Sequence, residues 1–337
     1  MKQLIIFILI LIFSNCCYAE NKILERVSDR VRVIIDNDFG GDPDGLFQLA
    51  HQLLSPSGEV KAIIASQHYS GGFYGNPGDS AFSRKQVDDL LAIMKLPVTP
   101  LLFTGSDGAL SSTRKAKVTQ AAKYIVEEAM RDDKRPLYIV CGASLTTIAS
   151  ALLMKPEIAQ RMTLVWIGGP EYPEFAYPPP NAQPVEYNIG IDIKAAQVVF
   201  NYSSIPIWQV PRDSYRQAIV SLAELKNRMN EKGALAKYML LKLNELLVKA
   251  DGTLGETYVM GDNPLTLLSV LQTSWEKDPA SSKYVVKKSP LINNNGAYEE
   301  NKSARNIRVY THIDTRLMFE DFFAKVAYFD GPNLLKK

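Results

Sequence analysis

Short runs of β-branched and apolar residues alternate along the chain with longer stretches whose apolar positions recur every three or four residues. The short runs predict strands and the longer, periodic stretches predict helices. The predicted strands are Arg32–Ile35, Val60–Ser66, Leu101–Phe103, Leu137–Val140, Thr163–Ile167, Ile205–Val210 and Ile307–Tyr310. The predicted helices are Gly45–Leu54, Arg84–Met94, Val118–Arg131, Thr146–Leu153, Ile193–Phe200, Leu222–Ala250, Pro264–Leu271 and Thr315–Tyr328.

This alternation indicates an α/β fold, with an open, mainly parallel sheet and helices on both faces. No repeat and no linker rich in proline, glycine or serine divides the sequence, so residues 20–337 are expected to form a single domain. An apolar share of 46% suits a large core. The 38 Lys and Arg nearly balance the 36 Asp and Glu, which gives no indication of a nucleic-acid-binding surface.

The first residues have the features of a secretory signal. Lys2 supplies a positive charge, and Leu4–Phe13 is an unbroken apolar run. That run is shorter than the roughly 20 residues that a membrane-spanning helix needs. Cys17-Tyr18-Ala19 offers small residues at the −3 and −1 positions of a cleavage site. We therefore expect residues 1–19 to be a cleavable signal peptide and the protein to be exported, to a bacterial periplasm.

The cysteines bear on this expectation. The alternative to cleavage is a lipoprotein anchored through Cys16 or Cys17, although Asn15 is unfavourable for that processing. Cleavage after Ala19 leaves Cys141 alone, so the exported chain has no intrachain disulfide. Cys141 is then either a thiol nucleophile or, more commonly, a small buried apolar side chain.

The segment between the first predicted strand and helix carries the strongest chemical signal. It reads Asp36-Asn37-Asp38-Phe39-Gly40-Gly41-Asp42-Pro43-Asp44-Gly45 and places four carboxylates in one glycine-rich turn. Like charges this close repel one another, so the folded turn is expected to need a cation. Carboxylates without histidine or cysteine suit calcium or magnesium. A turn between strand and helix is also where open α/β sheets place active sites.

Three interpretations of this turn compete, and the first two are an EF-hand calcium loop and a phosphatase motif. An EF-hand loop fits poorly, because Gly40 occupies its fifth position and Phe47 occupies the position of its bidentate glutamate. A magnesium-dependent, haloacid-dehalogenase-like phosphatase has its nucleophile in a strand followed by Asp-x-Asp-x-Thr/Val. Asp36-Asn37-Asp38-Phe39 fits this pattern, but Gly40 replaces the Thr or Val. This second reading stays open as an alternative.

Four segments in register resemble the inosine–uridine preferring nucleoside hydrolase family. The acidic turn resembles its strand–Asp-x-Asp-Pro-Gly-x-Asp-Asp signature, with Phe39 for the proline and Pro43 inserted between the paired acids. The later segments are Tyr138 to Thr147, Trp166 to Asp192 with Asn181 and Glu186-Tyr187-Asn188, and Gly261-Asp262-Asn263-Pro264-Leu265. Together they span about Val31 to Leu268, and four motifs in the family's order make a specific match.

The resemblance implies the nucleoside hydrolase fold and a calcium ion. Its ligands would be Asp38, Asp44, Asp262 and the backbone carbonyl of Cys141. Calcium accepts such mixed carboxylate and carbonyl oxygens. The implied reaction is hydrolysis of the N-glycosidic bond of a ribonucleoside or related N-riboside, with Asp38 taking a proton from the attacking water. The implied partner is therefore a small nucleoside or ribose-containing ligand, and the family's tendency is toward homodimers or homotetramers.

The resemblance also assigns the sugar contacts. Asp42 would hold ribose hydroxyls, and Asn181, Glu186 and Asn188 would hold the 5′-hydroxyl side. The family signature ends in two adjacent aspartates, and Pro43 makes the position of the second one ambiguous. Counting from the strand places Pro43 at that position, whereas counting back from the helix places Asp44 there. Counting from the helix makes Asp44 the metal ligand, which is the assignment adopted.

One departure concerns the leaving base. The family's histidine before the late aspartate is Gly261 in this chain. His68, beside the aromatic loop Tyr69 to Ala81, and Tyr258 are the candidates to contact the base in its place. A non-catalytic receptor for a nucleoside or ribose therefore stays open as an alternative. The loops Tyr69 to Ala81 and Glu171 to Pro184 are either walls of an aromatic pocket or proline-stiffened surface segments.

Overall fold

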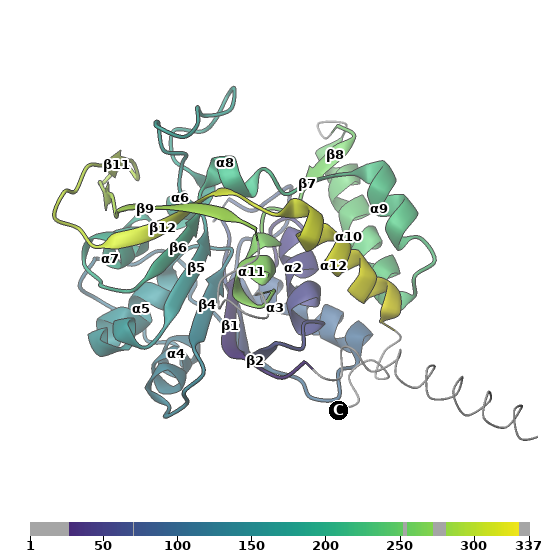
Figure 1. Cartoon of the computed structure of the whole chain (residues 1–337), viewed down its shortest axis with the longest axis horizontal. Coiled ribbons are helices and arrows are strands. Elements are labelled where there is room, and N and C mark those ends of the chain that lie inside the picture. The colour runs from purple at the N-terminus through teal and green to yellow at the C-terminus, as the bar shows by residue number, and fades with distance from the viewer. Residues whose placement is uncertain (1–26, 70, 252–254, 272–280, 330–337) are drawn as a thin grey trace, which may run out of the picture.

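The computed structural model describes residues 27–69, 71–251, 255–271 and 281–329. The predicted signal peptide lies outside these residues. An eight-stranded sheet forms the centre of the molecule, in the order β3-β2-β1-β4-β5-β6-β12-β9 (Figure 1). Its strands are β1 (Val31–Asn37), β2 (Gly58–Ala65), β3 (Leu101–Thr104), β4 (Leu137–Cys141), β5 (Thr163–Ile167), β6 (Ile207–Val210), β9 (Lys283–Lys288) and β12 (Asn306–His312). All of its pairings are parallel except that of β9 with β12.

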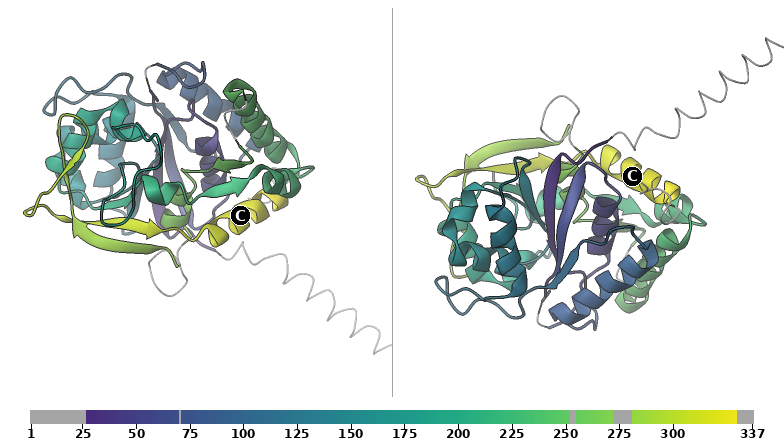
Figure 2. Two further views of the ribbon diagram at one scale, coloured as in Figure 1. Left: turned by 90° about the horizontal axis from the view of Figure 1, so that it is seen from above. Right: turned by 90° about the horizontal axis from the view of Figure 1, so that it is seen from below.

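Helices cover both faces of this sheet (Figure 2). One face carries α4 (Gln120–Met130), α5 (Thr146–Met154) and α7 (Ile193–Asn201). The other carries α2 (Asp44–Leu53), α3 (Ser80–Met94), α9 (Leu222–Met229), α10 (Ala234–Ala250), α11 (Pro264–Ser269) and α12 (Thr315–Tyr328). The remaining short elements are α6 (Tyr187–Ile191), α8 (Arg212–Tyr215), the 3-10 helix η2 (Pro156–Gln160), and the small antiparallel pairs β7 (Ile219–Ser221) with β8 (Thr257–Val259) and β10 (Leu291–Ile292) with β11 (Tyr298–Glu299). The predicted fold class is confirmed.

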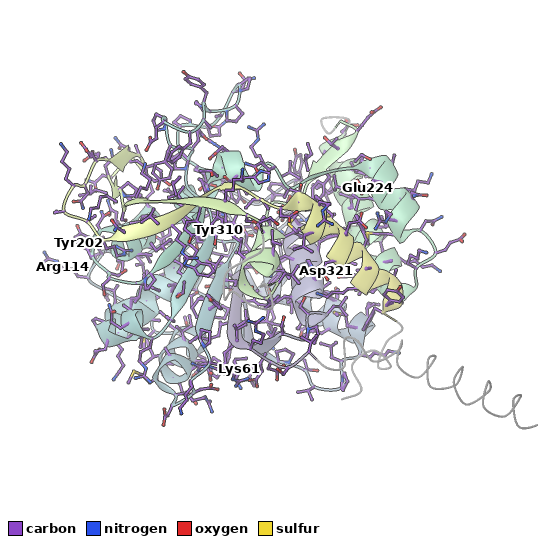
Figure 3. All side chains as sticks on the ribbon, in the orientation of Figure 1. Lys61, Arg114, Tyr202, Glu224, Tyr310 and Asp321 are labelled. Atoms are coloured by element: carbon purple, nitrogen blue, oxygen red, sulfur yellow. The ribbon has the colours of Figure 1, made fainter. Side chains whose placement is uncertain are left out.

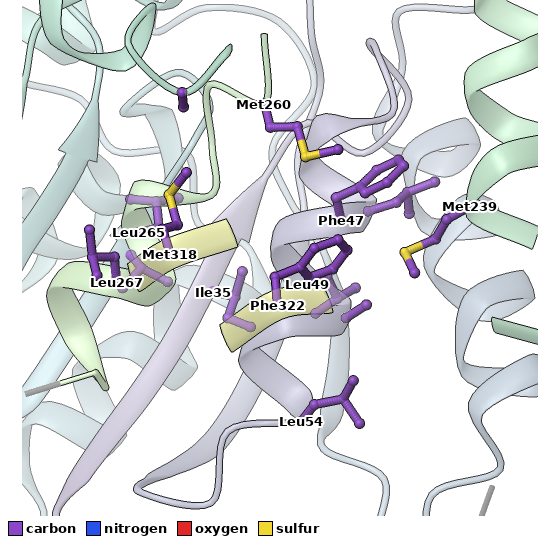
Figure 4. Close-up of a cluster of buried hydrophobic side chains, with 14 of the residues drawn as sticks. Ile35, Phe47, Leu49, Leu54, Met239, Met260, Leu265, Leu267, Met318 and Phe322 are labelled. Carbon is purple, nitrogen blue, oxygen red and sulfur yellow. The ribbon is translucent and has the colours of Figure 1, made fainter. Parts of the chain in front are cut away.

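Alternation along β1 explains the two cores. Val33 and Ile35 pack into the cluster under α2 and α12, whereas Ile34 packs into the cluster under α4 and α5. Figure 4 shows the first cluster, where Phe47 and Phe322 lie together with ring centroids 5.8 Å apart. A central parallel strand is buried on both faces, and all seven residues of β1 are buried, with β-branched apolar side chains at Val31, Val33, Ile34 and Ile35.

A buried polar contact joins α2 to α12 within this cluster. Asp321, on α12 (Figure 3), lies 2.8 Å from Nε2 of His51 and accepts a hydrogen bond of 2.5 Å from Lys325. Lys325 also donates to Ser55 Oγ at 2.8 Å. His51 is fully buried and its pKa is lowered, chiefly by that burial. Its role is structural, as its position inside the predicted helix indicates.

Two expectations about the elements were wrong. The predicted helix Leu222–Ala250 is two helices, because the chain takes positive φ angles at Glu231 and Gly233 and turns between α9 and α10. Strand β9 was not predicted, since its residues are mostly exposed at the sheet edge and leave no long apolar run. Among the described residues, no helix combines the length and apolar character that crossing a membrane requires.

Candidate active site

A cavity of about 270 Å³ opens where the carboxyl ends of β1, β4 and β5 meet the start of α2 and the segment before α11. This is the edge at which parallel α/β sheets bind ligands. Five carboxylates line it. Three belong to the acidic turn, Asp38, Asp42 and Asp44, and two come from distant segments, Glu186 and Asp262. The structure therefore brings together acids that lie more than two hundred residues apart in the sequence.

Asn37 connects the acidic turn to the late aspartate. It ends β1 fully buried, and its Nδ2 donates to Asp262 Oδ2 at 2.9 Å, while its Oδ1 accepts from the Asp38 backbone N–H at 2.8 Å. The Asp262 backbone N–H in turn donates to Asp44 Oδ2 at 3.2 Å. The sequence analysis missed Asn37, although a buried amide between two strand-end aspartates is itself a signal of a site.

Gly142 leaves room for this contact. A Cβ at this position would lie 2.6 Å from both Asn37 Oδ1 and Asp262 Oδ1, closer than side chains approach. The absence of a side chain after β4 therefore lets the carboxylate of Asp262 reach the end of β1.

Burying these carboxylates close together disfavours their ionised forms. Burial, and then the charges of Asp262 and Asp42, raise the pKa of Asp38 well above its usual range. The same causes raise the pKa of Asp44, and burial raises that of Asp262 to about 8. Carboxylates that resist ionisation when buried together either keep protons or bind a cation.

The donor set fits the calcium ion implied by the resemblance. Three of its carboxylates, Asp38, Asp44 and Asp262, are hard oxygen donors that line the same cavity, and such donors suit calcium. In the described part of the chain, however, no three His, Cys, Asp or Glu side chains are already arranged as a metal site. Bound calcium would therefore draw these carboxylates closer together.

Cys141 behaves as a buried apolar residue. Its Sγ lies 3.4 Å from the Ala143 carbonyl, packed in the cluster under α5, and burial raises the pKa of the thiol well above its usual range. Such a thiol is a poor nucleophile. Gly142, not Cys141, lines the cavity, and the role of the Cys141 carbonyl as a ligand stays a prediction.

Glu186 and Asn188 also line the cavity. Glu186 Oε2 accepts from the backbone N–H groups of Gly169 and Ile189, at 2.8 and 3.2 Å, and its Oε1 accepts from the Tyr215 hydroxyl at 3.2 Å. The amide of Asn188 donates to the carbonyls of Gly142 and Ile167, but its buried Oδ1 has no hydrogen-bond partner among the described residues. A buried acceptor of this kind is ready for a ligand hydroxyl.

The structure does not bring every predicted residue to the cavity. Asn181 is exposed in its loop, and neither it nor His68 lines the wall. His68 is buried behind the turn, with Nε2 2.7 Å from the Pro77 carbonyl. Tyr258 is also behind the wall, where its hydroxyl donates to Asp42 Oδ2 at 2.9 Å. Tyr258 thus supports Asp42 and does not face the cavity.

The two aromatic loops differ in their contribution. Phe73 of the first loop lines the cavity with Tyr187, their ring centroids 6.5 Å apart and nearly perpendicular. No residue of Glu171 to Pro184 lines it, and Tyr177 is 91% exposed. The first loop therefore contributes to the pocket wall, whereas the second does not line the pocket and is buried only at its start, where Tyr172 donates to Gln209 at 2.7 Å. Tyr187, Tyr215 and Arg216 complete the wall, and none of them was a predicted site residue.

Comparisons with known proteins agree on one family. Residues 84–320 match the family described as inosine-uridine preferring nucleoside hydrolase. A putative pyrimidine-specific ribonucleoside hydrolase of Shigella boydii serotype 4 is 31% identical over 166 residues, 48% of this chain and 64% of its own length. The inosine-uridine preferring nucleoside hydrolase of Leishmania major is 29% identical over 153 residues, 45% of this chain and 46% of its own. The chain thus spans less than two thirds of these curated relatives.

Solved structures extend the likeness over nearly the whole described chain. A purine-preferring ribonucleoside hydrolase from Gardnerella vaginalis superposes with a TM-score of 0.67 at 17% identity, covering 88% of this chain and 98% of its own. A plant nucleoside hydrolase gives 0.66 at 16% identity, covering 89% and 99%. At such identities the likeness establishes the fold. Because the sequence match also covers more than half of the chain, this protein belongs to the inosine–uridine preferring nucleoside hydrolase family.

Proposed function

We propose that the protein hydrolyses the N-glycosidic bond of ribonucleosides or related N-ribosides, giving ribose and a free base, and that it depends on calcium. The observation that carries this proposal is the convergence of Asp38, Asp44 and Asp262 on one cavity beside Glu186 and Asn188. The three aspartates can hold a divalent cation, and Glu186 and Asn188 offer acceptors to sugar hydroxyls.

Each residue has a distinct task in this proposal. Asp38, Asp44 and Asp262 would hold calcium, which when bound supplies Lewis-acid activation of water and binding of vicinal sugar hydroxyls. Asp38 accepts the proton of the attacking water, because its carboxylate lines the cavity beside the other acids that would hold the ion. Asp42, held by Tyr258, binds ribose hydroxyls, and Glu186 with Asn188 binds the 5′-hydroxyl side. These fixed contacts orient the sugar before reaction.

The test is reducing-sugar release from purine and pyrimidine ribosides, measured with calcium and with a chelator. We expect activity that disappears with the chelator and returns with calcium. Asp38→Asn should lower kcat by at least about a thousandfold with a smaller change in KM. A matched control is Asp79→Asn, which removes a carboxylate that caps α3 outside the cavity. Activity that persists in Asp38→Asn would refute the assigned base.

The contacts of the site bear differently on the two alternatives, a phosphatase and a non-catalytic receptor. The phosphatase interpretation needs Asp36 as an accessible nucleophile. Asp36 is instead fully buried, accepts a hydrogen bond of 2.5 Å from the Ser66 hydroxyl, and does not line the cavity. The receptor interpretation is still supported by one observation, namely that none of the described histidines lines the cavity. It predicts tight calcium-dependent binding of a nucleoside that stays intact on long incubation, which mass spectrometry of the bound ligand would decide.

A further inference from the structure

The chemistry of the leaving group sets a requirement that the cavity wall must meet. When the bond between C1′ and a neutral base breaks, the electron pair leaves on the base nitrogen and creates an anion, which needs a proton. When the base is already a cation, the same electron pair neutralises it, and no proton donor is required. The groups that line the cavity show which of these cases the site serves.

No described histidine can supply that proton. His51 is buried between α2 and α12, and His68 is buried behind the acidic turn. His312 is exposed at the end of β12. The position before Asp262 is Gly261, and a Cβ built there would contact Asp44 Oδ2 at 3.3 Å and the Tyr215 ring at 3.5 Å. The wall next to the acids therefore has no imidazole.

The remaining O–H groups on the wall are poor proton donors at neutral pH. The Tyr215 hydroxyl already donates to Glu186, and burial raises its pKa further above 10. Burial and then the charge of Asp38 raise the pKa of Tyr187 in the same direction. Burial raises the pKa of Glu186, but both of its carboxylate oxygens already accept hydrogen bonds from Gly169, Ile189 and Tyr215, so Glu186 is placed as an acceptor on this wall.

The charge and shape of the cavity favour a cation instead. Five acidic side chains line it and only one basic side chain, Arg216, so the formal charge of the lining is negative even when one divalent ion is counted with it. Phe73 and Tyr187 add two aromatic rings nearly perpendicular to each other. Aromatic faces attract organic cations, and a pyridinium or an N-alkylated purinium is a flat cation of this kind.

We infer that the preferred substrates are N-ribosides whose aglycone is a cationic aromatic ring, such as a pyridinium or an N7-alkylpurinium. The inference rests on the proposed hydrolysis and names its substrate class. In the reaction the C1′–N bond breaks and its electron pair neutralises the ring nitrogen. The water oxygen bonds to C1′ and its proton passes to Asp38. The base departs neutral, so every atom and charge is accounted for without a leaving-group acid.

The first experiment compares matched substrates on the unmodified protein with calcium. N7-methylinosine and nicotinamide riboside are the cations, and inosine and uridine are the neutral ribosides. We expect kcat/KM to be at least a hundredfold higher for the cations. Equal or faster cleavage of inosine or uridine would overturn the inference and leave the proposed hydrolysis intact. Cleavage of none of the four would instead refute the proposed hydrolysis itself.

The second experiment restores the missing donor. Gly261→His adds an imidazole beside Tyr215, and Gly261→Ala controls for the crowding that a Cβ causes near Asp44. Relative to the alanine variant, we expect the histidine variant to gain at least tenfold in kcat/KM for inosine and to show no matching gain for N7-methylinosine. An equal gain for both would contradict the argument. If the histidine variant fails to fold, the substrate comparison decides alone.

Discussion

Asp262 illustrates how a single residue links the site to stability. Its pKa is about 8 in the folded protein, raised chiefly by burial, and near 4 in an unfolded chain. As the pH rises, the unfolded chain loses this proton first, so the folded state binds more protons between these values. The fully buried Asp36, with a pKa raised to about 7, acts in the same direction.

We therefore predict that, in a chelator, the free energy of unfolding falls as the pH rises from about 4 to 8, by more than about 1 kcal/mol. Calcium should flatten this dependence, because the ion replaces the protons. Urea denaturation at pH 5, 6.5 and 8, with and without calcium, measures the effect. If the free energy of unfolding stays constant with pH in the chelator, burial does not raise the pKa values of these carboxylates.

Gly142 provides a second prediction at this scale. Gly142→Ala places a Cβ against Asn37 and Asp262, which hydrogen bonds hold in place. We expect a loss of about 1 to 3 kcal/mol in stability, typical of overpacking, together with loss of calcium binding. Gly255→Ala is the matched control, since a Cβ there meets no atom within 4 Å. Thermal unfolding and isothermal titration of calcium measure both effects, and unchanged calcium binding would contradict the proposed geometry.

At the scale of elements, α2 carries the acidic turn, and its far end is fixed to α12 by Asp321. Asp321→Ala leaves the buried His51 and Lys325 without their anion, which should cost about 2 to 4 kcal/mol. The neighbouring Glu320→Ala removes only an exposed contact with Arg228 and should change little. Urea denaturation of the two variants compares them directly. Equal effects would mean that the buried contact is not what fixes α12.

The elements also explain how much the sequence could predict. Strand β5 and helix α12 have the bounds that their apolar pattern predicts, because both are buried along one continuous face. The break at Gly233 and the exposed strand β9 escaped prediction, since a turn inside a helical pattern and a polar edge strand leave weak periodicity. Periodicity detects burial, and these two segments depend instead on local backbone geometry and on pairing with β12.

The site follows the same rule. The strand-end acids could be predicted because strand and turn are contiguous in sequence, and Asp262 followed from a resemblance in motif order. Asn37 and Tyr215 were missed, since nothing local marks a side chain that lines a cavity only when distant elements meet, whereas Phe73 belongs to the aromatic loop that was one of the predicted pocket walls. Asn181 and His68 were expected at the cavity from their motifs, but the conformations of their loops place them elsewhere.

At the scale of the whole molecule, we propose that the protein is exported after cleavage behind Ala19. Expressed in a Gram-negative host, the full chain should appear in the periplasmic fraction with Glu20 as its first residue, which intact-mass spectrometry would confirm. A diacylglycerol adduct on Cys16 or Cys17 would instead support lipid anchoring. Changing Ala19 to a bulky residue should block processing and leave the precursor in the membrane fraction.

The distance in sequence between Asn37 and the aspartate that it holds has a consequence for synthesis. A ribosome makes the acidic turn early, but the nascent chain lacks the last acid until some two hundred further residues have been added. A partial translation product that ends before Asp262 would lack part of the proposed site, and we expect it to be inactive. On the proposed function, activity would arise only late in the synthesis of each chain.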